Sequence, residues 1–283
     1  MATRINPLIS QRVVKAQLWG LTGFTIAILF FIICFVSIKG LPQITLDFLI
    51  TNPGDMGRSG GIFSTIMSTL YLIFIALMIA VPLGIGAAIY LTEYTRESRI
   101  TYIIRFGTEC LAGIPSIILG LFGFAFFVMA LHLGWSILSG GMTMSIMLLP
   151  TIIRTSEESI KAVPYALREV CFSLGVTKWQ TVTKVVLPTA LPGIVTGVVL
   201  SIGRCIGETA VVLFTAGSSL RLPQSFFDSG RTMAVHFYIL AREGISMPNA
   251  YGTATILIFS ILCINLCAYY LMRRFLKKYA IFG

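Results

Sequence analysis

Six long apolar runs divide the chain, and short polar or charged segments separate them. The runs cover residues 18–38, 62–91, 110–131, 136–153, 191–215 and 250–272. Each is long enough to cross most or all of a hydrocarbon layer of about 30 Å as a helix, and lipid offers backbone groups no partner outside that helix. The pattern therefore predicts six transmembrane helices. The link at residues 132–134 is very short, so we expect the third and fourth helices to form a hairpin.

Composition supports a membrane protein. Only 11% of the 283 residues are charged and 56% are hydrophobic, whereas a soluble domain carries about a quarter charged residues. The net charge of +10 could indicate nucleic-acid binding, but the basic residues lie at the ends of the apolar runs, which favours a membrane protein without a nucleic-acid partner. No CxxC pair occurs, and the two histidines, His132 and His236, are far apart. We therefore expect inert free thiols, no metal and no cofactor.

The distribution of basic residues predicts the orientation. With the N-terminus inside, the inner segments hold 15 of the 21 lysines and arginines, the outer segments hold five, and Arg204 lies within the fifth run. Because cytoplasmic loops carry the excess of positive charge, both termini are expected in the cytoplasm. The acidic and basic residues that follow the second run are expected to form a solvated cytoplasmic turn: Glu93, Arg96, Glu97 and Arg99.

The loop at residues 154–188 predicts two short helices. Pro164 suits a helix start, and Gly175 suits a helix end. Thr177 and Gln180 have the spacing of a capping box, which predicts a second helix immediately afterwards. Four apolar residues would form one stripe along the first helix: Leu167, Val170, Cys171 and Leu174. The hairpin could lie on the bilayer or dock on a cytoplasmic partner, and its closeness to two spans disfavours a DNA-reading helix-turn-helix.

Two charges lie inside the fifth run. Arg204 and Glu208 are four residues apart and would share a helix face with Ser201 and Thr215. A charge at the bilayer centre costs about 3 kcal/mol, so such residues face a protein interior or a water-filled path. Either the pair only pins helices together, or Arg204 meets a passing anion while Glu208 holds its guanidinium. Small residues at four-residue spacing predict close helix packing: Gly193, Gly197 and Ser201, then Gly203 and Gly207.

The loop sequence REVCFSLGVTKWQTVTKVVLP resembles the coupling-loop motif of ABC-importer permeases: Glu-Ala-Ala, a glycine after three residues, then Ile-x-Leu-Pro after nine more. Glu169, Gly175, Leu187 and Pro188 match at that spacing, and small apolar residues replace the alanines and the isoleucine. GIPSIILGLF, MLLPTIIRTSEESIKAVP and RCIGETA look like permeases of phosphate-specific ABC importers. GDMGRSGGIFSTIMSTL and PLGIGAAIYLTEY favour the A-type (PstA-type) subunit. The resemblance covers about residues 54–272.

This resemblance implies an all-α, six-span type I ABC importer permease fold and a multi-pass protein of a bacterial or archaeal cell membrane. It implies a permease domain at residues 62–272, preceded by the N-terminal span and outer loop at 1–61 and followed by a basic tail at 273–283. Partners would be a homologous second permease in a heterodimer, two ATP-binding subunits and an extracytoplasmic phosphate-binding protein. The residues implied in ATPase coupling are Arg168, Glu169, Leu174, Gly175, Thr177 and Lys178. The chain has no G-x-x-x-x-G-K-[ST] loop, so it is not expected to hydrolyse ATP itself.

Alternatives remain from the sequence. The permease could carry another small oxyanion, such as molybdate or sulfate. Inverted repeats between the halves would favour an ion-driven secondary transporter, but the sequence shows none, and the coupling loop argues against this alternative. A membrane enzyme would need a cluster of catalytic side chains, which the chain lacks. The outer loop at residues 218–249 could meet a binding protein or be merely solvated.

Overall fold

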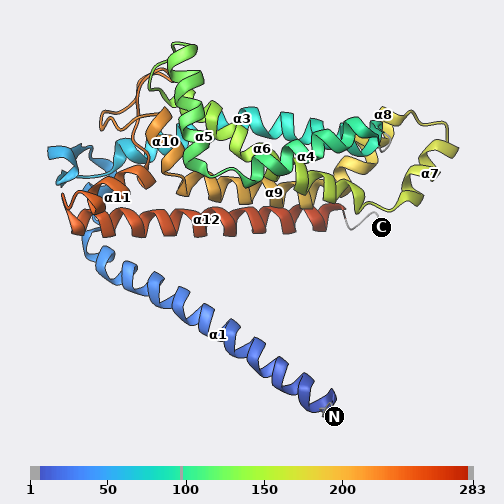
Figure 1. Ribbon diagram of the computed structural model, residues 1–283, viewed down its shortest axis with the longest axis horizontal. Coiled ribbons are helices and arrows are strands. Elements are labelled where there is room, and N and C mark those ends of the chain that lie inside the picture. Colours follow the sequence, from blue (N-terminus) through green and yellow to red (C-terminus); the bar gives the residue numbers. More distant parts are fainter. Residues whose placement is uncertain (1–6, 96–97, 280–283) are drawn as a thin grey trace, which may run out of the picture.

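The computed structural model describes residues 7–95 and 98–279, which form an elongated bundle of long helices (Figure 1). Its principal helices are α1 (Pro7–Gly40), α3 (Phe63–Ile89), α4 (Arg99–Gly113), α6 (Ile137–Lys161), α9 (Leu187–Gly207) and α12 (Met247–Tyr279). Within the described residues, five helical segments are long and apolar enough to cross a membrane: Gln11–Gln43, Phe63–Tyr94, Ile137–Lys161, Lys178–Gly207 and Met247–Tyr270. A bent pair of helices supplies the sixth span.

The sixth span is the third in chain order, and it is a bent pair of helices that begins before the apolar run at residues 110–131. It consists of α4 and of α5 (Ser116–Gly123), which continues into a π-helical segment at Phe124–Ala130 (η4). The two halves are bent by 101° at Ile114–Pro115. Pro115 lacks the N–H that would continue the helical hydrogen bonds and disfavours helical backbone at the preceding residue, and Ile114 is extended (φ −72°, ψ 128°). Figure 1 shows α5 projecting across the long axis of the bundle.

Helices α3, α6 and α9 form the centre of the bundle, and small residues let them approach closely. A side chain at Gly84 of α3 would meet Ile152 of α6, and one at Gly141 of α6 would meet Ile75 of α3. The predicted small-residue row of α9 packs as expected, because Gly193 and Gly197 touch Ser159 and Thr155 of α6. For the second row, Gly203 and Gly207, no other described part of the chain comes within 4 Å of an added Cβ.

The two ends of the bundle carry short elements. At one end lie α2 (Leu46–Ile50), a small hairpin of β1 (Pro53–Gly54) and β2 (Ser59–Gly60), α10 (Ala210–Thr215) and α11 (Met233–Arg242). The opposite end carries α7 (Tyr165–Ser173) and α8 (Lys178–Thr181). The first described turn of α1 and the last of α12 point toward the end that carries α7 and α8 (Figure 1). This arrangement agrees with the predicted topology of six crossings.

Three π-helical turns interrupt the long helices, at Tyr90–Tyr94 (η3), Phe124–Ala130 (η4) and Val182–Val186 (η5). A π turn inserts a residue into an α-helix and changes the direction of the side chains around it, and such turns are frequent at functional sites. Two of the three, η3 and η5, adjoin the end of the bundle that carries α7 and α8.

Candidate functional site

The fifth span ends earlier than predicted, at the charged residues. Helix α9 stops at Gly207, and Glu208 takes an extended conformation (φ −75°, ψ 129°) before α10 begins at Ala210. The Glu208 carboxylate turns to the new helix, where Oε1 accepts the Val211 N–H at 3.4 Å. No ion pair within 4 Å joins Arg204 and Glu208 in the described structure. The expectation of a neutralised pair on one continuous helix face is therefore wrong.

The predicted polar stripe also separates into two sets. Ser201 and Thr215 are fully buried, and their hydroxyls donate to backbone carbonyls one turn earlier, at 2.9 Å to Gly197 and 2.6 Å to Val211. Arg204 is exposed at the surface of this chain. The helix break explains why Glu208 and Thr215 leave the predicted face, because both follow Gly207. Ser201 and Arg204 lie in the same unbroken helix, where α6 covers the Ser201 side and leaves Arg204 exposed. Only Arg204 and the half-buried Glu208 can reach a path outside this chain's own core.

The breaks in the third and fifth spans are joined through packing. Helices α5 and α10, which follow the two breaks, lie against each other: a Cβ on Gly120 would be 3.1 Å from Val211 Cα. Gly123 of α5 likewise touches Thr143 of α6. Broken helices inside a membrane leave backbone groups without intrahelical partners, and such irregular backbone is tolerated where it is buried in protein or lines a water-filled cavity. Arg204 lies in the last turn of α9, next to this paired discontinuity.

The other predicted site residues belong to the coupling hairpin, which we define as residues 164–181. Both predicted helices form, Gly175 ends the first with a positive φ of 76°, and Thr177 makes the predicted capping box with Gln180. Leu174 is 76% exposed at the tip and Glu169 is exposed on α7. Exposed apolar side chains gather on this hairpin: Tyr165, Val170, Phe172, Leu174 and Trp179. All of these except Trp179 lie outside the segments that could cross a membrane, and an exposed apolar patch is typical of a protein-interaction surface.

Arg168 differs from the rest of the hairpin because its guanidinium is buried within the chain. Nη2 lies 2.7 Å from Glu93 Oε1, and Nη1 donates to the Val163 carbonyl at 2.8 Å. A role of Arg168 in ATPase coupling would therefore be indirect. The expectation of a solvated turn is wrong for Glu93, whose side chain is only 8% exposed, while Arg96 and Glu97 lie outside the described residues. The chain position of Glu93, at the end of a span, gave no signal of this pairing.

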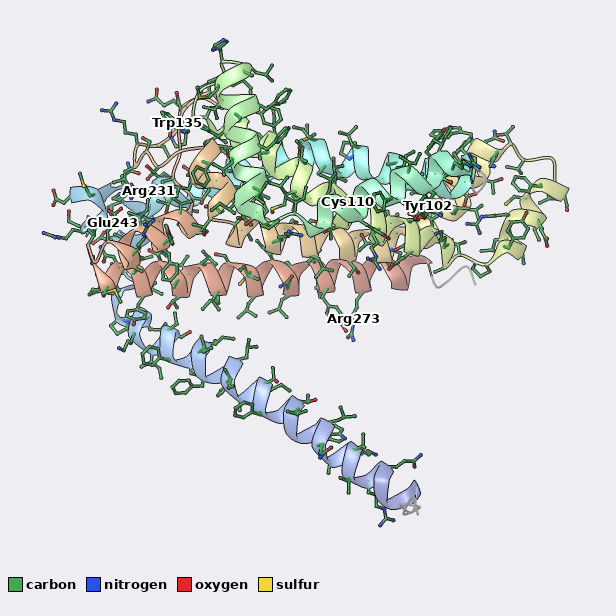
Figure 2. The ribbon with its side chains drawn as sticks, in the orientation of Figure 1. Tyr102, Cys110, Trp135, Arg231, Glu243 and Arg273 are labelled. Atoms are coloured by element: carbon green, nitrogen blue, oxygen red, sulfur yellow. The ribbon has the colours of Figure 1, made fainter. Side chains whose placement is uncertain are left out.

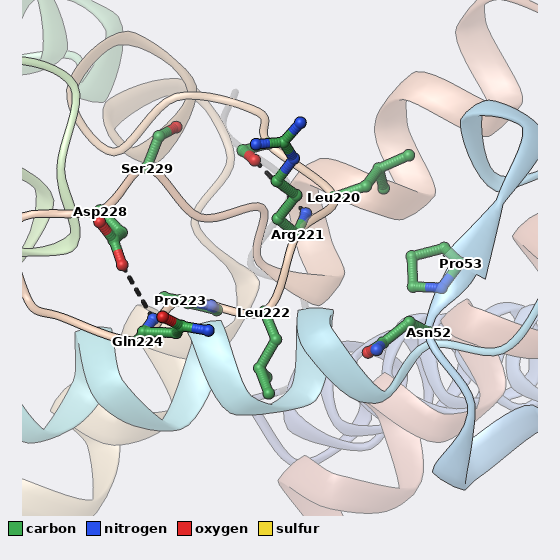
Figure 3. A pocket seen from close by; sticks show the side chains of 10 residues that line it. Asn52, Pro53, Leu220, Arg221, Leu222, Pro223, Gln224, Asp228 and Ser229 are labelled. Carbon is green, nitrogen blue, oxygen red and sulfur yellow. Dashed lines mark hydrogen bonds between the residues drawn. The ribbon is translucent and has the colours of Figure 1, made fainter.

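The outer loop takes a defined conformation, with residues 224–228 exposed. A pocket of about 680 Å³ lies between Asn52–Pro53 and the loop at residues 219–229 (Figure 3). Asp228 Oδ2 accepts the backbone N–H groups of Gln224 and Ser225 at 2.9 and 2.8 Å, which fixes the loop. Arg231 is buried and donates to the Ser218 carbonyl at 2.9 Å. Figure 2 shows Arg231 and Glu243 at this same end.

The sequence matches known transport proteins along most of its length. The family described as "Binding-protein-dependent transport system inner membrane component" matches residues 80–281. The chain is 34% identical over 291 aligned positions to the Bacillus subtilis (strain 168) "Probable ABC transporter permease protein YqgI", covering 97% of this chain and 99% of that one. It is 35% identical to "Phosphate transport system permease protein PstA 1" of Mycobacterium tuberculosis (strain CDC 1551 / Oshkosh), covering 74% of this chain and 70% of that one.

Solved structures share the fold. A chain of the bacterial alginate ABC transporter, crystallised with an alginate-bound periplasmic protein, superposes with a TM-score of 0.69 at 16% identity, covering 95% of this chain and 96% of that one. The MetNI methionine ABC transporter in an inward-facing conformation gives a TM-score of 0.60 at 20% identity, covering 76% of this chain and 94% of that one. At these identities the likeness establishes the fold alone.

Proposed function

Because the chain belongs to the family of binding-protein-dependent transport system inner membrane components, we propose that it is the permease subunit of an ATP-driven importer of inorganic phosphate. The observation that carries the substrate is the likeness to phosphate transport permeases, at 35% identity over 74% of the chain for one of them. As a transport subunit it provides half of a translocation path and carries out no chemistry of its own.

The coupling hairpin supports the use of a separate ATPase. It projects from one end of the bundle, and its apolar side chains are exposed in the part of the chain that the structure describes (Figure 1). Docked in a cleft of an ATP-binding subunit, the hairpin would move when two such subunits close on ATP. That movement would reach the bundle through α6 and α9, between which the hairpin is inserted.

Arg204 supplies the chemistry that a phosphate path requires. Its guanidinium is exposed and positive, and it has no carboxylate partner within 4 Å in the described structure. A guanidinium donates up to two parallel hydrogen bonds to a phosphate oxyanion. Glu208, four residues away at the helix break, provides a nearby negative charge that would weaken retention of the anion. Conduction requires binding strong enough to enter and weak enough to leave.

The complete importer would contain further chains. One permease forms only half of a path, so a homologous second permease would face Arg204 and the two glycines of α9 that have open space beside them, Gly203 and Gly207. Two ATP-binding subunits would bind the two coupling hairpins. An extracytoplasmic phosphate-binding protein would deliver the anion at the end that carries the 680 Å³ pocket. The protein would lie in a bacterial or archaeal cell membrane.

Competition for uptake tests the assigned substrate against the second candidate, another small oxyanion. We expect cells that depend on this importer to take up labelled phosphate, and unlabelled phosphate to suppress that uptake at concentrations where sulfate and molybdate do not. A purified complex should contain an ATPase and a second permease. Suppression by molybdate or sulfate instead of phosphate would reassign the substrate, and uptake without any ATPase in the complex would remove the importer class.

A further inference from the structure

The π-helical turn η3, which continues the inner end of α3, contacts the coupling hairpin, although the two are far apart in the sequence. The contact centres on the Arg168 guanidinium, which lies 2.7 Å (Nη2) and 3.0 Å (Nε) from Glu93 Oε1. Both side chains are less than a tenth exposed, at 9% for Arg168 and 8% for Glu93. A buried pair in which two guanidinium N–H groups donate to one carboxylate oxygen is held more firmly than the surface ion pair of Arg154 and Glu158, whose side chains are 75% and 66% exposed.

The same guanidinium also binds the end of α6. Its Nη1 donates to the Val163 carbonyl at 2.8 Å, and Nη2 donates to the Ile160 carbonyl at 3.0 Å. The Ile160 carbonyl lies in the last turn of α6, where helix carbonyls carry partial negative charge, and the Val163 carbonyl lies two residues beyond the helix end. One side chain from α7 thus joins α6 to η3. Lysine could not make this set of contacts, because it lacks the planar fork of donors.

A π turn places the partner residues. The last turn of the second span, η3 (Tyr90–Tyr94), is π-helical, and the Thr95 N–H donates to the Tyr90 carbonyl at 3.1 Å. Two successive residues of this turn reach the hairpin. Glu93 forms an ion pair with Arg168 of α7. The Lys178 ammonium of α8 lies over the Tyr94 ring, 5.3 Å from the ring centroid. The two contacts hold both helices of the hairpin.

We propose that Glu93 and Arg168, assisted by Tyr94 and Lys178, form a clamp that makes α3 move together with the coupling hairpin. The proposal rests on the proposed function, in which an ATPase moves that hairpin. The hairpin is joined by the chain to α6 and α9 but not to α3. The clamp gives α3 a direct connection of its own, so that the three central helices respond as one body. These are positioning residues, since none of them touches the transported ion.

The ratio of anion transported to ATP hydrolysed tests the clamp. The complete complex is reconstituted in proteoliposomes with Glu93→Gln, Glu93→Asp or Tyr94→Ala. We expect Glu93→Gln to lower the ratio roughly tenfold while ATP hydrolysis continues. Glu93→Asp, which keeps the charge, should restore part of it, and Tyr94→Ala should lower it less. Glu158→Gln is the matched control, because it breaks an exposed pair at the same end of the bundle and should leave the ratio unchanged.

An assembled Glu93→Gln complex with the wild-type ratio would overturn the clamp. So would a Glu93→Gln complex that fails to assemble while Tyr94→Ala keeps the wild-type ratio, because the contact would then serve folding alone. The ratio is measured with whichever oxyanion the wild-type complex takes up, so a wrong phosphate assignment leaves this test intact. A wild-type complex that hydrolyses ATP and transports no oxyanion would contradict the proposed function and the clamp together.

Discussion

His236 is a buried base at the outer end of the molecule. It is only 1% exposed, and its Cε1 atom packs closely on Gly57, where an added Cβ would lie 2.7 Å away. Its Nδ1 atom is buried without a hydrogen-bond partner among the described residues. Burial, followed by the positive charge of Arg231, lowers the pKa of His236 from 6.5 to about 4.

This pKa predicts that acid destabilises the outer end. The unfolded state takes up a proton near pH 6.5 and the folded state only near pH 4, so the stabilising contribution is complete above pH 6.5 and is lost as the pH falls toward 4. At pH 5 the loss amounts to about 2 kcal/mol. We expect the thermal midpoint of the detergent-solubilised protein to fall between pH 7.5 and pH 5, and His236→Gln to remove most of that fall.

His132 offers the matched control, because the sequence contains only these two histidines and His132 is exposed in a turn. His132→Gln should leave the pH dependence as in the wild type. An unchanged dependence in His236→Gln would show that other groups cause it.

Single-residue predictions were reliable where local chemistry decides the outcome. Thr177 caps its helix and Gly175 ends one because capping and positive φ depend on neighbours in the chain. Predictions failed where distant contacts decide. Arg168 is buried in a pair with Glu93, which is 75 residues away in the sequence. No local pattern indicates that contact.

At the scale of elements, the packing of α6 against α9 depends on glycine. Gly193 and Gly197 have no side chains, and their backbone lies directly against Ser159 and Thr155. In a membrane, such close approach provides the dispersion contacts that hold helices together, because lipid is as apolar as the helix surface.

Gly197→Ala should weaken this interface, because the new Cβ collides with Thr155 Oγ1. Overpacking of this kind costs about 1–3 kcal/mol, so we expect a lower midpoint of thermal unfolding in detergent. Gly203→Ala lies in the same helix with nothing within 4 Å, and should leave the midpoint unchanged or slightly higher. Adding Thr155→Ala to Gly197→Ala should recover part of the loss. Equal effects of the two single alanine variants would contradict the close packing.

The helix breaks were only partly predictable from sequence. Pro115 indicates a break in the third span, because proline disfavours helix at the residue before it. Its size, a bend of 101°, follows from the packing of α5 on α10, which no local pattern contains. The sequence around Glu208 contains no comparable signal of a helix break. It follows a glycine and lies four residues after Arg204, and an unbroken helix fits those letters equally well.

At the scale of the whole molecule, the coupling hairpin lies at the cytoplasmic end of six packed spans. Two of these spans are broken and pack against each other near Arg204. The six spans could be predicted because apolar length is a property of the sequence alone. The packing of the broken spans and the contact between η3 and the hairpin depend on tertiary contacts, so they could not be predicted in this way. The exposed side of Arg204 and the uncovered apolar side chains of the hairpin leave surfaces that further subunits would cover in the complex.

The most direct test is ATP-driven phosphate accumulation by the reconstituted complex, compared between the wild type and Arg204→Gln. We predict that the wild-type complex accumulates phosphate only with ATP, and that Arg204→Gln abolishes accumulation while assembly and ATPase docking persist. Arg12→Gln, the same change at an exposed arginine of α1, should behave as the wild type. Wild-type accumulation by an assembled Arg204→Gln complex would contradict the account, as would a wild-type complex that moves no phosphate when ATP is supplied.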